Sequence, residues 1–427
     1  MGKGIVENKN GFVTRNNVLT KYRGGIGDVV IPDGIVGITT HAFDGWGQKI
    51  TSLSIPDSVK EIEPYAFTDC ESATHFRLST ALTKISEGVF FDCHALKEID
   101  LPDKVSRIEN EAFSHCVNLE RIGLSAKLSA IGHYAFFKCR RLKSVTIPKN
   151  VKSIGSFAFA GCTDLETIIL PEGLKTISES AFERCENLKN IIIPDSVERI
   201  AKSAFKNCTK LEAITLPKEM NSIGEEAFHN CSSLKTITMP KHMNSIGEKA
   251  FEKCGLLKSI EVPNGLTILK KGVFEECKSL EKVTLPDSIR TISSEVFALC
   301  QNLSTINMPA NLEKIGAYAF AQCCFTEIYL PNRVKNIGEG VFYECRDLRC
   351  IQIPQSVTSF GKYALGRCNP SILNIFCTED SVAERYAREN NFHKVTLLQT
   401  VEEKCPNCST KLVEDAFFCH HCGTKIV

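Results

Sequence analysis

The sequence predicts a repeat solenoid, in which short, similar coils stack on one another. Phenylalanine, cysteine and proline each recur every 23 residues, from Phe67 to Phe320, from Cys70 to Cys323 and from Pro148 to Pro309. The three series keep one phase over more than 250 residues. A fixed period of this length is typical of stacked supersecondary units.

One unit, 148–170, shows how a coil is built. Ile168 and Leu170 alternate with Ile169, as in a short strand whose neighbouring side chains face opposite sides. The proline that follows ends this strand because it cannot donate a ladder hydrogen bond. A second extended piece, Val151–Ile154, leads into a turn, and an Ala–Phe pair then places a large ring in the interior.

The coils should stack because a single coil cannot bury its own apolar side, so each phenylalanine should lie over the next. About 15 units span residues 32–376, and the period slips once to 22 after Cys323. A unit of 23 residues is too short for two helices and a strand. Turns and very short helical pieces are therefore expected on the convex side, opposite a parallel β-sheet face.

The recurring pattern Leu-x-x-Ile-x-Leu-Pro-x-x-Val-x-x-Ile-Gly-x-x-Ala-Phe-x-x-Cys resembles the BspA-type leucine-rich repeat over residues 32–376. This resemblance implies a right-handed solenoid of the leucine-rich-repeat type, a role in protein–protein contact or adhesion, and no catalytic residue. Residues 12–22 look like the β-hairpin lead-in of such arrays, so 1–31 is expected to be an N-terminal cap. Many family members are exported, whereas no leader is expected here.

Fourteen cysteines, from Cys70 to Cys368, occupy the same repeat slot. We interpret them as small buried hydrophobes with a weak S–H donor at a tight turn. Disulfides between adjacent coils and metal ligation along the row are the alternatives. Packing is favoured because a slot repeated so often needs no redox role. Cys324, Cys350 and Cys377 lie outside this row and are expected to be more exposed.

Two segments close the repeat array. Residues 377–396 are predicted to form a C-terminal cap with a short helix, because Ser381 and Glu384 match a capping box. Val382, Ala383, Tyr386 and Ala387 then follow at helical spacing. This helix should cover the open end of the last coil. Residues 397–404 are predicted to be a charged linker.

The last segment, 405–427, is predicted to hold one structural Zn²⁺. Two CxxC pairs, Cys405 with Cys408 and Cys419 with Cys422, are ten residues apart and offer four thiolates for tetrahedral coordination. The segment resembles a zinc ribbon, although Ser409 stands where the usual glycine would follow the first pair. His420 and His421 are competing ligands in principle. A redox CxxC pair is disfavoured because two motifs are present without a βαβ context.

Composition excludes several function classes. The 51 Lys and Arg residues nearly balance 50 Asp and Glu, so nucleic acid and anionic membranes are not favoured partners. The chain contains no P-loop, GxGxxG, GxSxG or HExxH motif, and its histidines are scattered. No stretch approaches the ~18 apolar residues of a membrane span. We expect a monomeric, cytoplasmic protein without enzymatic activity.

The sheet face is the expected binding site for an unidentified protein partner. Its outward positions lack charge over several coils, and strand propensity alone is the competing explanation for their composition. The candidate contact residues are Thr146, Thr167, Ile169, Asn190, Ile192, Thr215, Thr236 and Thr238. The leading functional hypothesis is a protein-interaction scaffold with the ribbon as a structural or second contact module. The alternatives are a nucleic-acid-associated regulator acting through the ribbon and an exported cell-surface adhesin.

Overall fold

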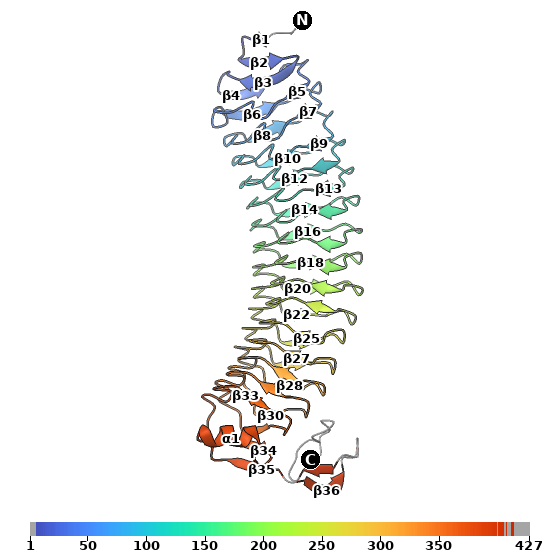
Figure 1. Cartoon of the computed structure of the whole chain (residues 1–427). Coiled ribbons are helices and arrows are strands. Elements are labelled where there is room, and N and C mark those ends of the chain that lie inside the picture. The colour runs from blue at the N-terminus through green and yellow to red at the C-terminus, as the bar shows by residue number, and fades with distance from the viewer. Residues whose placement is uncertain (1–5, 399, 405–406, 408–410, 414–427) are drawn as a thin grey trace. The chain divides into compact units, whose positions relative to one another are not determined.

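The computed structural model describes residues 6–398, 400–404, 407 and 411–413 (Figure 1). The chain divides into two compact units, Met1–Pro217 and Lys218–Val427, called unit 1 and unit 2 below. Each unit is a stack of short coils, and most coils contribute two very short strands. The predicted repeat solenoid is therefore confirmed for both units.

Unit 1 begins with antiparallel strands. Strand β1 (Val6–Glu7) pairs with β2 (Phe12–Arg15), which pairs with β3 (Val18–Tyr22). Strand β3 then pairs in parallel with β5 (Gly37–Ile38), the first two-residue strand of the repeats. The hairpin thus gives the first coil a hydrogen-bonding neighbour, which the end of an open stack would lack.

In unit 1 the strands form two rows, a first row of mostly three-residue strands and a second row of two-residue strands. The first row is β4 (Gly27–Val30), β6 (Ile50–Ser54), β8 (His75–Arg77), β10 (Glu98–Asp100), β12 (Arg121–Gly123), β14 (Ser144–Thr146), β16 (Thr167–Ile169), β18 (Asn190–Ile192) and β20 (Ala213–Thr215). The second row is β5, β7 (Glu61–Ile62), β9 (Lys84–Ile85), β11 (Arg107–Ile108), β13 (Ala130–Ile131), β15 (Ser153–Ile154), β17 (Thr176–Ile177) and β19 (Arg199–Ile200).

Unit 2 repeats the same two rows. Its first row is β22 (Thr236–Ile237), β24 (Ser259–Glu261), β26 (Lys282–Thr284), β28 (Thr305–Ile306), β30 (Glu327–Tyr329), β32 (Cys350–Gln352), β34 (Asn374–Cys377) and β35 (Val395–Leu397). Its second row is β21 (Ser222–Ile223), β23 (Ser245–Ile246), β25 (Ile268–Leu269), β27 (Thr291–Ile292), β29 (Lys314–Ile315), β31 (Asn336–Ile337) and β33 (Ser359–Phe360).

Neighbouring coils pair slot for slot. Strand β14 pairs in parallel with β16, placing Val145 beside Ile168, and β13 pairs with β15, placing Ile131 beside Ile154. The expected single sheet is nevertheless interrupted, because β10–β12 and β14–β16 form separate two-stranded ladders. A strand of three residues makes few ladder bonds before a turn begins, so small departures in twist break the pairing.

The predicted stack of phenylalanines fills the interior of both units. In unit 1 the rings of Phe113 and Phe136 are 5.3 Å apart and 1° from parallel, and those of Phe159 and Phe182 are 5.8 Å apart at 11°. The same stacking recurs in unit 2, from Phe228 to Phe342. The rings from Phe43 to Phe297 are fully buried, so each coil completes the core of its neighbour.

The cysteine row is buried and its members form no disulfides, as the packing interpretation predicts. Each of several thiols also donates to the phenylalanine carbonyl of the preceding coil, as Cys139 does to Phe113 at 3.1 Å. Burial raises the pKa of the Cys70 and Cys277 thiols to about 12, which keeps them protonated, and Cys277 donates to the Phe251 carbonyl at 3.2 Å. Outside the row, Cys324 and Cys350 are half-buried as expected, but the expectation for Cys377 is wrong because it is buried on β34.

The expected helical pieces opposite the first row are not found. Among the described residues α1 (Val382–Glu389) is the single α-helix, and turns occupy the remaining segments of the coils. The reason is a pair of left-handed residues in each coil, such as Tyr134 with φ of 55° and Lys138 with φ of 57°. Two positive-φ residues only four positions apart interrupt any right-handed helical run in this part of the coil.

The predicted cap helix covers the last coil of unit 2. Ser381 is its N-cap, and its hydroxyl accepts a hydrogen bond from the Glu384 N–H at 3.2 Å. The Tyr386 hydroxyl accepts a bond from the buried Leu365 N–H at 3.1 Å, and its ring lies 4.4 Å from that of Phe360.

The segment predicted to be a linker, 397–404, contains a strand instead. Strand β36 (Thr400–Lys404) pairs antiparallel with β37 (Lys411–Val413). Thr400 and Val401 are residue types that favour a strand, and this preference was outweighed in the prediction by the charged residues that follow them.

Candidate protein-binding surface

The first-row surface of unit 1 is set by the alternation within each strand. The middle residues Val145, Ile168, Ile191 and Ile214 are buried, and the residues on either side of each are exposed. The structure therefore places every predicted contact residue of this unit at the surface. These are Thr146, Thr167, Ile169, Asn190, Ile192 and Thr215. We call this set the first-row face.

Two predicted contact residues belong to unit 2. Thr236 lies on β22 and Thr238 follows that strand, and both side chains are exposed. Their strand has the same alternation, with Ile237 buried beside Thr236. They form part of the corresponding first row of unit 2 and are not included in the first-row face of unit 1.

The most apolar part of the first-row face is formed by two isoleucines. Ile169 on β16 is 58% exposed and Ile192 on β18 is 76% exposed, in the same slot of consecutive coils. Their slot neighbours are threonines, since Thr146 pairs with Ile169 and Ile192 pairs with Thr215. Exposing two large aliphatic side chains at neighbouring sites leaves apolar surface in water, which is typical of a contact surface.

A charged border accompanies the first-row face and was not found by sequence reasoning. The residue directly before each first-row strand from β10 to β20 is charged, and the sign of its charge alternates from coil to coil. The members are Lys97, Glu120, Lys143, Glu166, Lys189 and Glu212, all exposed. Lys143 lies 4.0 Å from Glu120. Alternation avoids like charges on adjacent coils, and the signal was visible in the sequence as a 46-residue period.

The charged residues of β10 and β12 in the first row pair with one another. On β12, Arg121 contacts Glu98 at 3.2 Å and Asp100 at 2.7 Å. The Arg121 hydrogen bonds hold the pKa of Asp100 below its usual range. These groups are solvent-exposed, so they contribute little to stability. The strands that carry Ile169 and Ile192 contain no charged residue.

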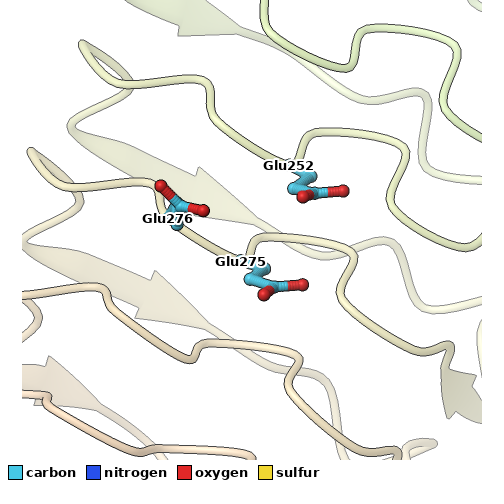
Figure 2. Close-up of side chains that lie close together, drawn as sticks. All are labelled: Glu252, Glu275 and Glu276. Atoms are coloured by element: carbon cyan, nitrogen blue, oxygen red, sulfur yellow. The ribbon is translucent and has the colours of Figure 1, made fainter.

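Unit 2 contains an acidic cluster of the kind that can hold a metal ion. Glu252, Glu275 and Glu276 come from two adjacent coils, with their carboxylates close together (Figure 2). Lysines already neutralise the cluster, because Lys249 lies 3.1 Å from Glu252 and Lys253 lies 3.6 Å from Glu276. The most direct assignment is a ladder of ion pairs between coils.

His229 and Glu275 complete this network. The His229 Nδ1 lies 3.1 Å from the buried Glu252 carboxylate. Glu275 Oε2 has no hydrogen bond among the described residues, and Lys249 lies 3.8 Å from it. Burial, and then the negative charge of Glu252, raise the pKa of Glu275.

The predicted zinc ligands Cys405, Cys408, Cys419 and Cys422 lie outside the described residues. The structure describes the backbone of β36 and β37, which flank the first of the two cysteine pairs in the sequence. Of the helices in the described part of the chain, none has the length and apolar character needed to cross a bilayer.

Comparison with known proteins identifies the family to which the repeats belong. The family model for the BspA type leucine rich repeat region matches residues 21–143, 129–256, 198–324 and 313–422. Among curated proteins, none matches the chain significantly. Leucine-rich repeat proteins of this kind are generally non-catalytic scaffolds.

Solved structures are similar over most of the chain. A leucine-rich repeat protein from Bacteroides ovatus is 27% identical, covers 92% of this chain and 97% of its own, and has a TM-score of 0.74. A leucine rich cell surface protein from Faecalibacterium prausnitzii is 25% identical, covers 71% of this chain and 92% of its own, and has a TM-score of 0.45. The family model matches more than half of the residues of the chain. The chain therefore belongs to the BspA-type leucine-rich repeat family.

Proposed function

We propose that the chain is a non-catalytic protein-interaction scaffold whose partner binds the first-row face of unit 1. The observation that carries this proposal is the exposure of Ile169 and Ile192 in one slot of consecutive coils. Strand propensity favours isoleucine in a strand, but it does not require that two isoleucines face water together. A partner that covers them removes apolar surface from water, at roughly 25 cal/mol per Å².

The face also suits a protein more than a small molecule. Threonine, asparagine and isoleucine side chains alternate along it, and the Lys–Glu border beside it offers charges of both signs. Protein interfaces combine such an uncharged centre with a polar rim. A border of alternating sign would orient a partner without attracting every acidic or basic protein.

The test uses the full chain as bait in affinity purification with mass spectrometry. The variant Ile169→Asp with Ile192→Asp places two carboxylates at the proposed contact and is expected to lose the partner at least about tenfold. Ile268→Asp is the matched control, because Ile268 is 49% exposed on the second row of unit 2. Identical co-purification profiles for the wild type and the double variant would remove the first-row face from consideration.

Zinc binding by the C-terminal segment is a separate part of this proposal. It is supported by the spacing of Cys405, Cys408, Cys419 and Cys422, whose four thiolates suit one tetrahedral Zn²⁺. Some twenty residues cannot bury a core of their own, so the metal would supply the folding energy of this segment and leave the solenoid independent of it.

Metal analysis of the purified chain tests the zinc proposal. One zinc per chain is expected in the wild type and none in Cys419→Ser with Cys422→Ser. The same variant should retain the partner of the first-row face if the ribbon is only structural. Loss of the partner together with the zinc would make the ribbon a contact module instead.

The proposed compartment is the reducing cytoplasm. It is supported by the 17 cysteines among the described residues, which form no disulfides, and by the need of a zinc ribbon for reduced thiolates. Fractionation of the source cells tests it: the chain should appear in the cytosolic fraction, and recovery at the cell surface would favour an adhesin.

A further inference from the structure

Unit 1 has a pocket on its turn side, away from the residues of the first-row face. It has a volume of about 670 Å³, within the range of small ligand sites. The lining residues that matter here are Phe137, Phe157, Lys138, Arg140, Glu183 and Arg184, with Ala160, Gly161 and Thr163 also contributing.

The pocket exists because one coil lacks two side chains that its neighbours carry. The two residues before the row cysteine are Phe137 and Lys138 in one coil and Glu183 and Arg184 two coils later. In the coil between them the same slots hold Ala160 and Gly161. Gly161 has a φ of +76°, so its backbone matches the left-handed residues of this slot without filling the space.

The missing side chains leave a notch between two cations. Lys138 and Arg184 occupy the same slot two coils apart, roughly 10 Å at the spacing of parallel strands. Arg140 adds a third positive charge, and among the described residues no carboxylate lies within ion-pair distance of it. Glu183 is the one carboxylate of the lining, and Arg184 also lies 3.9 Å from Glu186 outside the lining, so the three cations exceed these two anions by one charge.

The aromatic wall of the notch is held rigidly. The ring of Phe157 stacks on Tyr134 at 4.8 Å and 4°, and Phe137 meets the edge of Tyr134 at 5.5 Å. The Lys138 Nζ lies 4.9 Å from the centre of the Phe137 ring and 3.3 Å from His115 Nε2. Burial lowers the pKa of His115, so its ring is neutral at physiological pH and can accept from the lysine.

We propose that this notch binds a peptide side chain bearing an oxyanion that stands next to an apolar residue. Arg184 and Lys138 would bind the oxyanion from opposite sides, and Phe137 and Phe157 would cover the apolar residue. Guanidinium groups bind carboxylate and phosphate with the same paired geometry, so the oxyanion is a carboxylate or a phosphorylated residue. The proposal rests on the proposed function only in that both assign protein ligands to unit 1.

A peptide fits better than single-stranded nucleic acid. A nucleic acid strand would need a cationic track several nucleotides long. In the three coils before Lys138, the residue at the same slot is Asp69, Asp92 or His115. In the coil after Arg184 it is Asn207. The three cations are therefore confined to one notch, which suits a single anionic group.

The test is ligand-observed saturation-transfer NMR on the full chain. The probes are the capped peptides Gly-Glu-Phe-Gly and Gly-phosphoserine-Phe-Gly, with Gly-Gln-Phe-Gly as the uncharged control. At least one oxyanion peptide is expected to bind at least about fivefold more tightly than the glutamine peptide, and the tighter of the two identifies the source of the oxyanion. Equal binding of all three peptides, or preferential binding of an eight-residue oligothymidine, would overturn the proposal.

Three variants make the assignment specific. Lys138→Gln with Arg184→Gln removes the charge, and Gly161→Asn fills the notch with a residue that the same slot carries at Asn207 and Asn230 with positive φ. Each is expected to weaken oxyanion binding at least about fivefold, whereas Arg199→Gln, an exposed arginine on β19, should leave it unchanged. Unchanged binding in the two notch variants would remove the site.

The two proposals fail separately. Ile169→Asp with Ile192→Asp should leave peptide binding in the notch intact, and the notch variants should leave the partner of the first-row face bound. If both sets of variants lost peptide binding, the loss could not be assigned to the notch, and this result would contradict the proposed site.

Discussion

The thiol of Cys139 donates a hydrogen bond of 3.1 Å to the carbonyl oxygen of Phe113, 26 residues earlier in the chain. The same bond joins Cys116 to Phe90 and Cys162 to Phe136. The cysteine therefore does more than fill space, because its thiol adds a second hydrogen bond, from the neighbouring coil, to a carbonyl that already accepts from the Cys116 N–H at 3.2 Å. This explains why a small hydrophobe such as alanine is not used in the slot.

Cys139→Ala should lower the free energy of unfolding by about 1 kcal/mol, because it removes one of the two hydrogen bonds to the Phe113 carbonyl and opens a small void. Urea denaturation followed by far-UV circular dichroism measures the effect. Cys139→Ser, which keeps a donor in the slot, should lose less. Equal stability of Cys139→Ala and the wild type would show that the bond contributes nothing.

Stability should fall at high pH because the row thiols have a raised pKa in the folded state. Burial raises the pKa of Cys70 and Cys277 from 9.0 to about 12. Unfolded thiols ionise near 9, so folding competes with thiolate formation above that value. The free energy of unfolding should be steady below about pH 8 and should decrease between pH 9 and 12.

Chemical denaturation at a series of pH values checks this expectation. Cys139→Ala carries one row thiol fewer and should show a shallower decrease above pH 9. A decrease of the same steepness in that variant would assign the effect to lysine or tyrosine titration.

Tyr386→Phe should loosen the C-terminal cap of unit 2. It removes the hydroxyl that accepts from the buried Leu365 N–H, so the variant should lose about 1–3 kcal/mol of local stability. Amide hydrogen exchange at Leu365 reads the change directly. Tyr363→Phe is the control, since Tyr363 is 59% exposed and its replacement should leave that exchange rate alone.

Leu299→Asn should stabilise unit 2. Leu299 has a φ of 63° in a slot that holds Asn207 and Asn230 elsewhere, and leucine tolerates the left-handed region less well than asparagine does. The expected gain is about 0.5–1 kcal/mol, measured as a higher midpoint of thermal unfolding. Leu256→Asn replaces an exposed leucine outside the left-handed positions and should give no such gain.

The repeat architecture could be predicted because its packing has the same period as its sequence. Phe159 and Phe182 are 23 residues apart and meet in the core for that reason alone. The outward direction of Ile169 and Ile192 followed in the same way from strand alternation. Such features need no long-range contact that differs from coil to coil.

The left-handed residues could not be predicted from side-chain type. Tyr134, Lys138 and Phe157 occupy these positions although none of them prefers positive φ. The conformation is imposed by hydrogen bonds between coils, such as those of the Tyr134 and Lys138 N–H groups to the next coil. A signal was present nonetheless, because glycine recurs in the same slots at Gly88, Gly161 and Gly272.

The notch was missed for a related reason. Its cause, small residues at 160 and 161, is visible only when equivalent slots of neighbouring coils are compared side by side. The 23-residue period identifies the features that recur, whereas the candidate site arises where one coil departs from the pattern. The predicted contact residues of the first-row face were read from the regular part and lie where they were expected.

The 22-residue coil after Cys323 shows what the array tolerates. The strands on either side still pair in register, with Lys314 beside Asn336, and Cys345 still donates to the Phe320 carbonyl across 25 residues instead of 26. A deleted residue is thus absorbed by a turn while the second-row ladder continues, although β28 and β30 of the first row belong to separate sheets. Gene-level duplication or loss of a complete repeat would meet even less resistance, so proteins of this design can change their length in evolution without inventing a new core.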